Sequence, residues 1–386
     1  MDSNSKHRTF LSIFFFLAGV SFSTWASRIP TIKAAFGFNE AELGTLLFAM
    51  PIASLIGLPI SGILVSKFDT RVPLTISFLV HAIALTCISF ANNTYTLVAA
   101  ICLFAFSMRI LNISVNTQAL TLQKRIGRKI NGTFHGLWST GGIVGVGITT
   151  LMLALKVSIT IHFIIISSLI FIITVTASPY LLKNDKSTSG NKIIVGKPDP
   201  YIFYLGVIVF FAAICEGGMF DWSGIYFKEI VHESIFTTGY LTFMAFMAMS
   251  RFVSDKIVEQ IGMAKTYILS ATAIMLGILL AITFPFFWTS LVGFSLVGFG
   301  AASIIPITFT LAGMSPKYSS GMAISIVTTY VIAGMLLGPP MIGYLAHGFG
   351  LRRAFIAFIC VAFMIIPISR LFFSHREKLT NQQKTI

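Results

Sequence analysis

Few ionisable side chains interrupt the long apolar runs of this sequence, and these few are the first candidates for chemistry. Glu216 is an acid placed well inside such a run, roughly 22 Å along a helix that begins at Tyr201. Burial disfavours the charged form of a carboxyl, so such a group can exchange a proton when its surroundings change. We therefore predict that Glu216 is a proton-coupling residue. The alternative is a neutral carboxyl that is hydrogen-bonded to a neighbouring helix.

A polar stripe is formed by Arg109, Asn112 and Asn116. Their spacing places all three on one face of a helix. A guanidinium and two amides that face hydrocarbon would be costly, so this face should line a wet cavity and bind substrate. The competing interpretation is a set of polar contacts that hold helices together.

The run that begins at Phe10 carries a matching stripe. It consists of Ser21, Thr24, Trp25 and Arg28, which again share one helical face. Hydroxyls, amides and an aromatic ring suit a small solute that bears hydroxyl or amino groups. We predict that Ser21, Thr24 and Trp25 contact such a substrate.

The elements that must position these residues are almost entirely apolar. Of the 386 residues, 55% are hydrophobic and 10% are charged, whereas a soluble domain is about a quarter charged. This balance excludes a soluble enzyme, a nucleic-acid-binding protein and a disordered chain. The net charge of +14 comes from basic clusters between apolar runs, which is typical of a protein that crosses a membrane many times.

The expected fold is an all-α integral membrane protein with twelve transmembrane helices, since each apolar run offers about 20 residues. The first run has no cleavage site after it and is expected to remain as the first helix. The runs are Phe10–Arg28, Leu43–Val65, Val72–Ala91, Tyr95–Leu122, Phe134–Leu155, Val157–Leu182, Tyr201–Tyr226, Gly239–Val258, Ala264–Phe284, Phe286–Gly313, Gly321–Ala346 and Ala354–Phe373.

The loops between the runs give an orientation and a division into domains. Lys and Arg gather in the loops on the side of the N-terminus, which predicts that both termini are cytoplasmic. The polar segment 183–200 is expected to be a cytoplasmic linker. It separates an N-terminal six-helix bundle, 1–182, from a C-terminal six-helix bundle with a short cytoplasmic tail, 201–386.

Cofactor and metal chemistry find no support in the sequence. The four cysteines lie in apolar runs without metal-ligand spacing, and phosphate-binding and zinc motifs are missing from the sequence. We expect no cofactor, no metal site and no enzymatic activity. His81, His135 and His162 are more typical of structural hydrogen-bonding residues than of a site.

A short motif repeats between the halves. The sequence GILVSK at 62–67 corresponds to RFVSDK at 251–256. These turns resemble the signature loop of the major facilitator superfamily, glycine-x-x-x-aspartate followed by basic residues, although Ser66 replaces the aspartate of the first copy. The resemblance implies a gating role for Lys67, Arg71, Arg251, Asp255 and Lys256. It also implies that Arg251 and Asp255, which are one helical turn apart, form a pair.

Longer segments resemble one branch of that superfamily. TWASRIPTIK, NISVNTQA, FHGLWSTGG, CEGGMFDWSGIYF and LLGPPMIGYLA are similar to the MosC/YbjJ-like bacterial permeases. The resemblance implies two pseudo-symmetric six-helix bundles whose first and seventh helices meet at an outer gate. It also implies a sugar-like or amino-sugar-like substrate.

Arg28 and Asp221 lie near the outer ends of the first and seventh runs, at similar depths. An ion pair between them would close the gate that the resemblance implies. The alternative is two interfacial charges that reach water. Trp222, next to Asp221, joins the predicted substrate-binding residues.

These features predict a secondary active transporter that moves a small polar organic solute by alternating access, coupled to protons. An efflux pump for amphiphilic drugs or metabolites is the alternative, and a non-transporting membrane receptor is a third hypothesis. The expected partners are the small-molecule substrate, protons and the lipid bilayer, without nucleic acid. The chain is expected to be a monomer in the cytoplasmic (inner) membrane of a bacterium.

Overall fold

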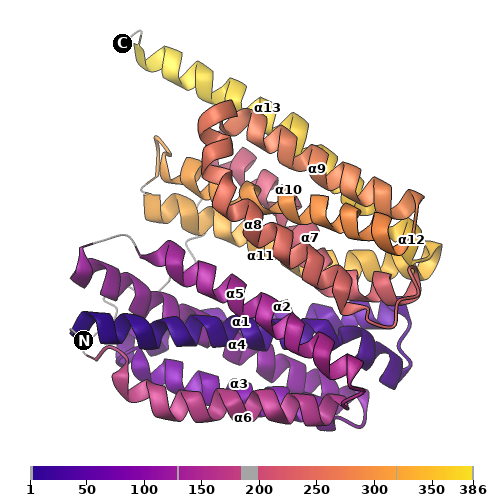
Figure 1. Ribbon diagram of the computed structural model, residues 1–386. Coiled ribbons are helices and arrows are strands. Elements are labelled where there is room, and N and C mark those ends of the chain that lie inside the picture. The colour runs from indigo at the N-terminus through magenta and orange to yellow at the C-terminus, as the bar shows by residue number, and fades with distance from the viewer. Residues whose placement is uncertain (1–2, 128–129, 184–198, 319, 385–386) are drawn as a thin grey trace. The chain divides into compact units, whose positions relative to one another are not determined.

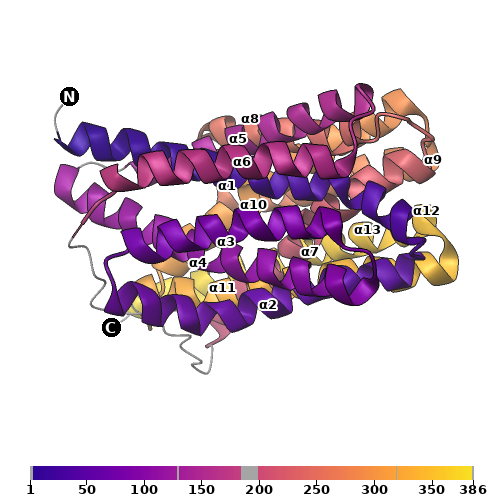
Figure 2. The ribbon, with the colours of Figure 1, turned by 90° about the horizontal axis from the view of Figure 1, so that it is seen from below.

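The computed structural model describes residues 3–127, 130–183, 199–318 and 320–384, and these residues are almost entirely helical. Figures 1 and 2 show the helices from two directions. They are α1 (Ser3–Phe36), α2 (Glu40–Lys67), α3 (Arg71–Phe90), α4 (Thr94–Ile126), α5 (Asn131–Ala154), α6 (Ile159–Ala177), the short 3-10 helix η1 (Ser178–Tyr180), α7 (Pro200–Glu229), α8 (Thr237–Ile261), α9 (Met263–Thr283), α10 (Phe287–Gly313), α11 (Ser320–Phe349), α12 (Leu351–Ala354) and α13 (Ile356–Lys384).

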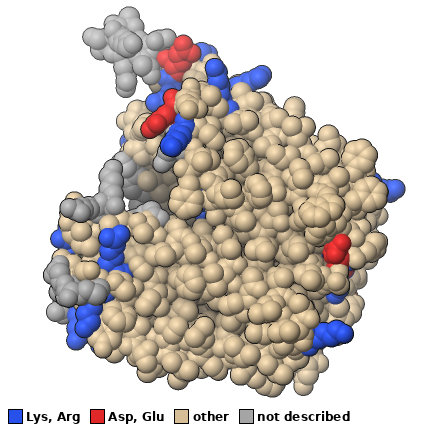
Figure 3. All heavy atoms as spheres, viewed as in Figure 1, with Lys and Arg blue, Asp and Glu red and all other residues tan. Residues whose placement is uncertain are grey.

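The predicted all-α fold is confirmed. Within the described residues, eleven helices are long and apolar enough to cross a membrane. The predicted run Gly239–Val258 corresponds to α8, a helix of 25 residues that stays outside this set and carries charged residues near its end. On the face in Figure 3, charged side chains gather toward the helix ends and the surface between them is almost entirely uncharged.

Local sequence explains where several helices begin and end. The side chain of Asp199 accepts a hydrogen bond from the backbone of Ile202, and Pro200 follows as the first residue of α7. Asn93 and Thr96 form a capping box at the start of α4. Between α5 and α6 the chain turns at Lys156, whose φ of 54° is left-handed. The predicted break there is therefore a tight turn.

Several helices extend beyond the predicted runs, and the end of α1 is an example. The first apolar run was expected to end at Arg28, but α1 continues to Phe36. Lys33 and its neighbours are polar enough to end an apolar run, yet they are compatible with a helix, so the helix extends past the run.

The described chain divides into two compact units. Unit 1 takes in Met1–Phe38 and Leu46–Lys192, and unit 2 takes in Asn39–Thr45 and Ile193–Ile386. The predicted linker 183–200 lies largely outside the described residues.

Unit 1 is held together by close packing of α1 on α5, of α3 on α4 and of α3 on α6. Glycines permit the first of these contacts. A Cβ atom at Gly141 would overlap the carbonyl oxygen of Phe16, and one at Gly19 would overlap the carbonyl oxygen of Trp138. Small residues at such positions let two membrane helices approach backbone to backbone.

Unit 2 repeats this pattern of pairs with α7 on α11, α9 on α10 and α9 on α13. Here too glycines lie at the contacts. A Cβ at Gly334 would overlap the carbonyl oxygen of Phe210, and Gly277 and Gly293 face each other between α9 and α10. The same order of partners in both units agrees with the sequence repeat between the halves.

Candidate functional site

Glu216 and Arg251 form an ion pair inside unit 2. Glu216 lies in the second half of α7, with 6% of its surface exposed. Its Oε1 is 3.6 Å from Nη2 of Arg251, which reaches across from α8. About a third of the Arg251 side chain, 34%, stays exposed. A carboxyl buried in membrane-spanning helices thus has a cation beside it that keeps some contact with solvent or lipid.

The surroundings of the pair are tightly packed on the α7 side. Gly217 faces Met335 of α11, and Gly218 faces Phe358 of α13. A side chain at Gly218 would displace the ring of Phe358, so the helix is fixed in place on either side of the carboxyl. Arg251 also approaches the sulfur of Met247 one turn earlier on α8. The carboxyl therefore lies on a closely packed helix, whereas the arginine is partly exposed.

Asp221, Trp222 and Ser223 follow in the next turns of α7. Asp221 is half-buried, whereas Trp222 and Ser223 are fully buried. The indole Nε1 of Trp222 and the hydroxyl of Ser223 have no hydrogen-bond partner among the described residues. Unsatisfied buried donors are uncommon in proteins and are frequent where a ligand or water binds.

In unit 1, the predicted stripe on α1 is buried. Trp25 packs on the ring of Phe104 of α4, with ring centroids 5.9 Å apart. The hydroxyl of Thr24 and the indole Nε1 of Trp25 lack a hydrogen-bond partner among the described residues, as Trp222 does in unit 2. Each unit thus contains a buried tryptophan whose indole Nε1 has no partner among the described residues.

Ser21 belongs to a hydrogen-bond cluster centred on His81 of α3. His81 Nε2 lies 2.8 Å from the Ser21 hydroxyl, and its Nδ1 lies 3.2 Å from the carbonyl oxygen of Phe104 and 3.1 Å from the Ser107 hydroxyl. Because a carbonyl only accepts, Nδ1 carries the proton and Nε2 accepts from Ser21. A single buried imidazole thus links α1, α3 and α4, in keeping with the structural hydrogen-bonding role that the sequence favours for His81.

Arg28 is also held within unit 1. It is 2% exposed, and it donates to Nδ1 of His162 at 3.2 Å and to the carbonyl oxygen of Val157 at 3.1 Å. These bonds fasten the outer part of α1 to the start of α6 and to the turn before it. The pairing of Arg28 with Asp221 would join two units, and it stays a prediction.

The stripe on α4 is half-buried. Arg109 donates from Nε to the hydroxyl of Ser54 on α2 at 2.7 Å. Asn116 donates from Nδ2 to the backbone carbonyl of Asn112, also at 2.7 Å. The three stripe residues share one side of α4, as the spacing predicts, and Arg109 is directed toward α2.

The residues of the two signature loops differ in their surroundings. Lys67 and Lys256 are exposed, and Arg71 is half-buried. The side chain of Asp255 lies outside the described residues, so its predicted pairing with Arg251 stays a prediction. The described partner of Arg251 is Glu216, which sequence reasoning had placed in a separate role.

The described residues contain no group of three or more His, Cys, Asp or Glu side chains that could hold a metal ion. Cys87, Cys102, Cys215 and Cys360 are free cysteines.

Sequence comparisons give the family. The model of the Major Facilitator Superfamily matches residues 10–313 and, in an overlapping match, residues 261–385. An uncharacterized MFS-type transporter of Yersinia pestis is 31% identical over 357 residues, covering 92% of both chains. The membrane protein MosC of Rhizobium meliloti is 28% identical over 371 residues, covering 94% of this chain and 89% of MosC.

The solved structures agree on the fold. A bacterial homolog of the human lysosomal transporter Spinster superposes with a TM-score of 0.78 at 13% identity, covering 96% of this chain and 97% of that one. The nucleoside transporter NupG gives 0.74 at 14% identity, covering 97% and 99%. These are multi-helix membrane transporters, and the fold described above is theirs. The chain belongs to the major facilitator superfamily, and the predicted likeness to MosC is confirmed.

Proposed function

We propose that this chain is a secondary active transporter that moves a small polar organic solute by alternating access, driven by protons that bind Glu216. The observation that carries the proposal is the ion pair between Glu216 and Arg251 within unit 2. Membership of a transporter superfamily supports transport itself. Proton coupling requires a buried acid whose protonation changes an interaction between helices. The ion pair supplies such an acid, because protonated Glu216 would no longer attract Arg251 of α8.

The pair gives protonation a mechanical consequence. Two unit charges near 4 Å attract by roughly 4 kcal/mol at an effective dielectric constant of about 20, before desolvation is counted. Ionised Glu216 therefore ties α8 to α7, and a proton on the carboxylate removes that attraction. Arg251 is then released from α7, and α8 can change its position relative to the carboxyl.

The substrate proposal is a sugar-like or amino-sugar-like solute. Thr24 and Trp25 in unit 1 and Trp222 and Ser223 in unit 2 offer buried hydroxyl and indole groups without partners among the described residues. A solute rich in hydroxyl or amino groups would satisfy them. NupG is by its name a nucleoside transporter, so ribose-bearing solutes belong in the test panel.

The proposal also includes the two gates, the orientation in the membrane and the oligomeric state. Arg28 and Asp221 would pair in the outward-closed state, and the basic residues of the two signature loops would act at the cytoplasmic gate. Both termini would lie in the cytoplasm of a bacterium, and the monomer would be the transporting unit.

Substrate identity is tested first, by thermal-shift screening of the purified protein against sugars, inositols, amino sugars, nucleosides and cationic drugs. The solute that stabilises the protein is then used in proteoliposomes. Binding of hydrophobic cationic drugs in place of polar solutes would favour efflux of amphiphiles.

Proton coupling is tested by uptake with and without an imposed proton gradient. Glu216→Gln keeps the hydrogen-bonding shape but cannot release a proton, so we expect it to lose gradient-driven accumulation and to keep substrate exchange. Glu259→Gln, an exposed acid on the same α8 helix as Arg251, is the matched control and should accumulate substrate as wild type does. Accumulation by Glu216→Gln under the gradient would refute the proposal.

The α4 stripe is tested by Asn116→Leu. This change removes the amide and should weaken substrate affinity by roughly 1–3 kcal/mol. Wild-type affinity in the single variants of all three stripe residues would exclude this face from the binding site.

A further inference from the structure

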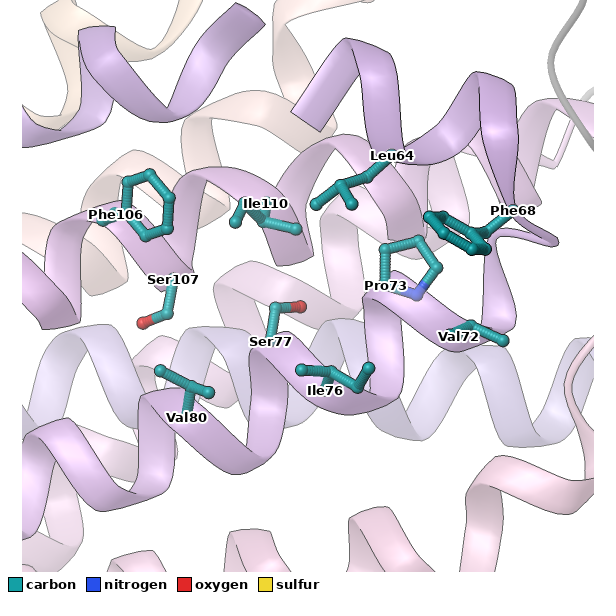
Figure 4. A pocket seen from close by; sticks show the side chains of 10 residues that line it. All are labelled: Leu64, Phe68, Val72, Pro73, Ile76, Ser77, Val80, Phe106, Ser107 and Ile110. Atoms are coloured by element: carbon teal, nitrogen blue, oxygen red, sulfur yellow. The ribbon is translucent and has the colours of Figure 1, made fainter. Parts of the chain in front are cut away.

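An apolar groove opens between α2, α3 and α4 in unit 1 (Figure 4). Its cavity volume is about 320 Å³, on the order of ten times the roughly 30 Å³ that one water molecule occupies in the liquid. Side chains of all three helices converge on this space. Its main apolar lining residues are Leu64, Phe68, Val72, Ile76, Phe106 and Ile110.

The groove lies next to a close approach of α2 to α4. At Gly57, α2 approaches α4 so closely that a Cβ atom would lie 3.2 Å from Cβ of Arg109. Beyond that point the side chains of the groove line an open space, whereas α3 and α4 stay closely packed.

The groove offers few hydrogen-bonding groups to water. Its two polar lining residues, Ser77 and Ser107, direct their hydroxyls to backbone carbonyls of their own helices, at 3.0 Å and 2.9 Å. A water molecule needs two to four polar partners to occupy a cavity, and these hydroxyls are already engaged. Hydrocarbon is therefore the natural occupant of the groove.

The rim of the groove faces the bilayer. Phe68, Val72 and Ile76 are exposed to 48%, 41% and 56%. Val72 and Ile76 belong to α3, which is long and apolar enough to cross a membrane, and Phe68 directly follows α2. An acyl chain can thus enter from the side without passing through the protein.

Positive charge lies at one end of the groove. Lys67 directly precedes Phe68, and Arg71 directly precedes Val72, so both cations flank its mouth at the turn between α2 and α3. Asp69 lies between them and leaves a net charge of +1 at this turn. One anionic phosphate complements that charge, and each basic residue near the membrane surface favours anionic lipid.

We propose that this groove is a binding site for one anionic phospholipid, with its phosphate at Lys67 and Arg71 and an acyl chain between α2, α3 and α4. The site is separate from the ion pair of unit 2, and the inference does not depend on proton coupling or on the substrate. An acyl chain in the groove would touch Ser107, whose hydroxyl contacts His81, the imidazole that links α1, α3 and α4.

The headgroup is tested by native mass spectrometry of the purified full chain with palmitoyl-oleoyl phosphatidylglycerol or phosphatidylethanolamine at graded concentrations. We expect wild type to bind one molecule of phosphatidylglycerol, with a higher affinity than it has for phosphatidylethanolamine. The double variant Lys67→Gln/Arg71→Gln should lose about tenfold or more in phosphatidylglycerol affinity. Lys265→Gln/Lys317→Gln removes two exposed lysines of unit 2 and should bind as wild type does.

The acyl chain is tested by filling the groove. Val80→Phe adds bulk to the groove from α3, at a half-buried position. Ile110→Phe adds bulk from α4, at a buried position. Both should reduce phosphatidylglycerol binding in protein whose helicity is unchanged, whereas Leu103→Phe, an exposed α4 residue outside the groove, should not. Equal affinity of wild type for the two lipids, or unchanged phosphatidylglycerol affinity in both the charge variant and the groove variants, would overturn the proposal.

Discussion

The candidate site arginines of the two units lie beside different kinds of partner. In unit 1, Arg28 donates to an imidazole nitrogen and a backbone carbonyl, and Arg109 donates to a serine hydroxyl. In unit 2, Arg251 faces the carboxylate of Glu216. Carbonyl and hydroxyl acceptors are neutral at all ordinary pH values, and the His162 imidazole accepts from Arg28 in its neutral form. A carboxylate instead carries a negative charge that it loses when it binds a proton. Under the proposed function, we therefore expect proton response to arise in unit 2, where the arginine faces a carboxylate.

A second difference concerns the corresponding helices α2 and α8. On α10, a Cβ at Gly298 would overlap the carbonyl oxygen of Phe243, so α8 and α10 are in backbone contact. In unit 1 the matching helix α2 leaves a groove beside α3 and α4. The helix that carries Arg251 is thus closely packed on α10, whereas its counterpart α2 borders the proposed lipid site.

The largest expected effect comes from breaking the ion pair. Arg251→Met leaves the buried carboxyl without its described cation, and we expect the free energy of unfolding to fall by about 3 kcal/mol, since uncompensated buried charges cost roughly 3–5 kcal/mol and Arg251 is partly exposed. Titration with sodium dodecyl sulfate in mixed micelles measures this value. The double variant Glu216→Gln/Arg251→Met should recover part of the loss. Equal losses in the single and double variants would show that the pair contributes nothing.

The framework of unit 1 is tested at the contact between α1 and α5. In Gly141→Ala the new methyl group meets the backbone of Phe16, and overpacking of this kind costs about 1–3 kcal/mol. Gly147→Ala on the same helix meets open space and serves as the control, with an expected change below about 0.5 kcal/mol. The same titration compares the two. Similar stability of both variants would contradict the close approach of α1 and α5.

The His81 cluster should contribute less. His81→Leu keeps the apolar bulk of the side chain and removes its bonds to Ser21 and to the α4 residues, which predicts a loss of roughly 1–2 kcal/mol. Transport by this variant should keep the pH dependence of wild type, because the cluster is a structural link. A shifted pH profile in proteoliposomes would instead make His81 part of the proton path.

The smallest effect is expected at the exposed loop lysines. Lys67→Gln and Lys256→Gln should each change the unfolding free energy by less than about 0.5 kcal/mol in lipid-free detergent, because both side chains are exposed. A large change in one loop only would show that the asymmetry between the units extends beyond the buried arginines.

Apolar run length alone predicts most of the helices. The twelve predicted runs correspond to the long helices of the structure. The turn at Lys156 is predicted by the single polar residue that separates two runs. The interior position of Glu216 also follows from sequence, since it depends only on the distance from the start of its run. The end of α1 does not, because a helix can continue past the last apolar residue.

The partners of the charged residues could not be predicted in the same way. Pairing of Glu216 with Arg251 depends on which faces of α7 and α8 meet, and that is decided by packing across the unit. The local spacing of Arg251 and Asp255 suggested a pair within one helix. Likewise, the sequence holds no trace of the contact between Arg28 and His162, which are 134 residues apart.

Infrared difference spectroscopy tests most directly whether Glu216 changes its protonation state. Purified protein in lipid is cycled between two pH values, and the carbonyl stretching band of a protonated carboxyl is followed in wild type, Glu216→Gln and Glu259→Gln. Proton coupling through Glu216 predicts a band that titrates over the pH range in which uptake changes, that persists in Glu259→Gln and that is lost in Glu216→Gln. The same band in Glu216→Gln, with wild-type amplitude, would show that another group carries the proton.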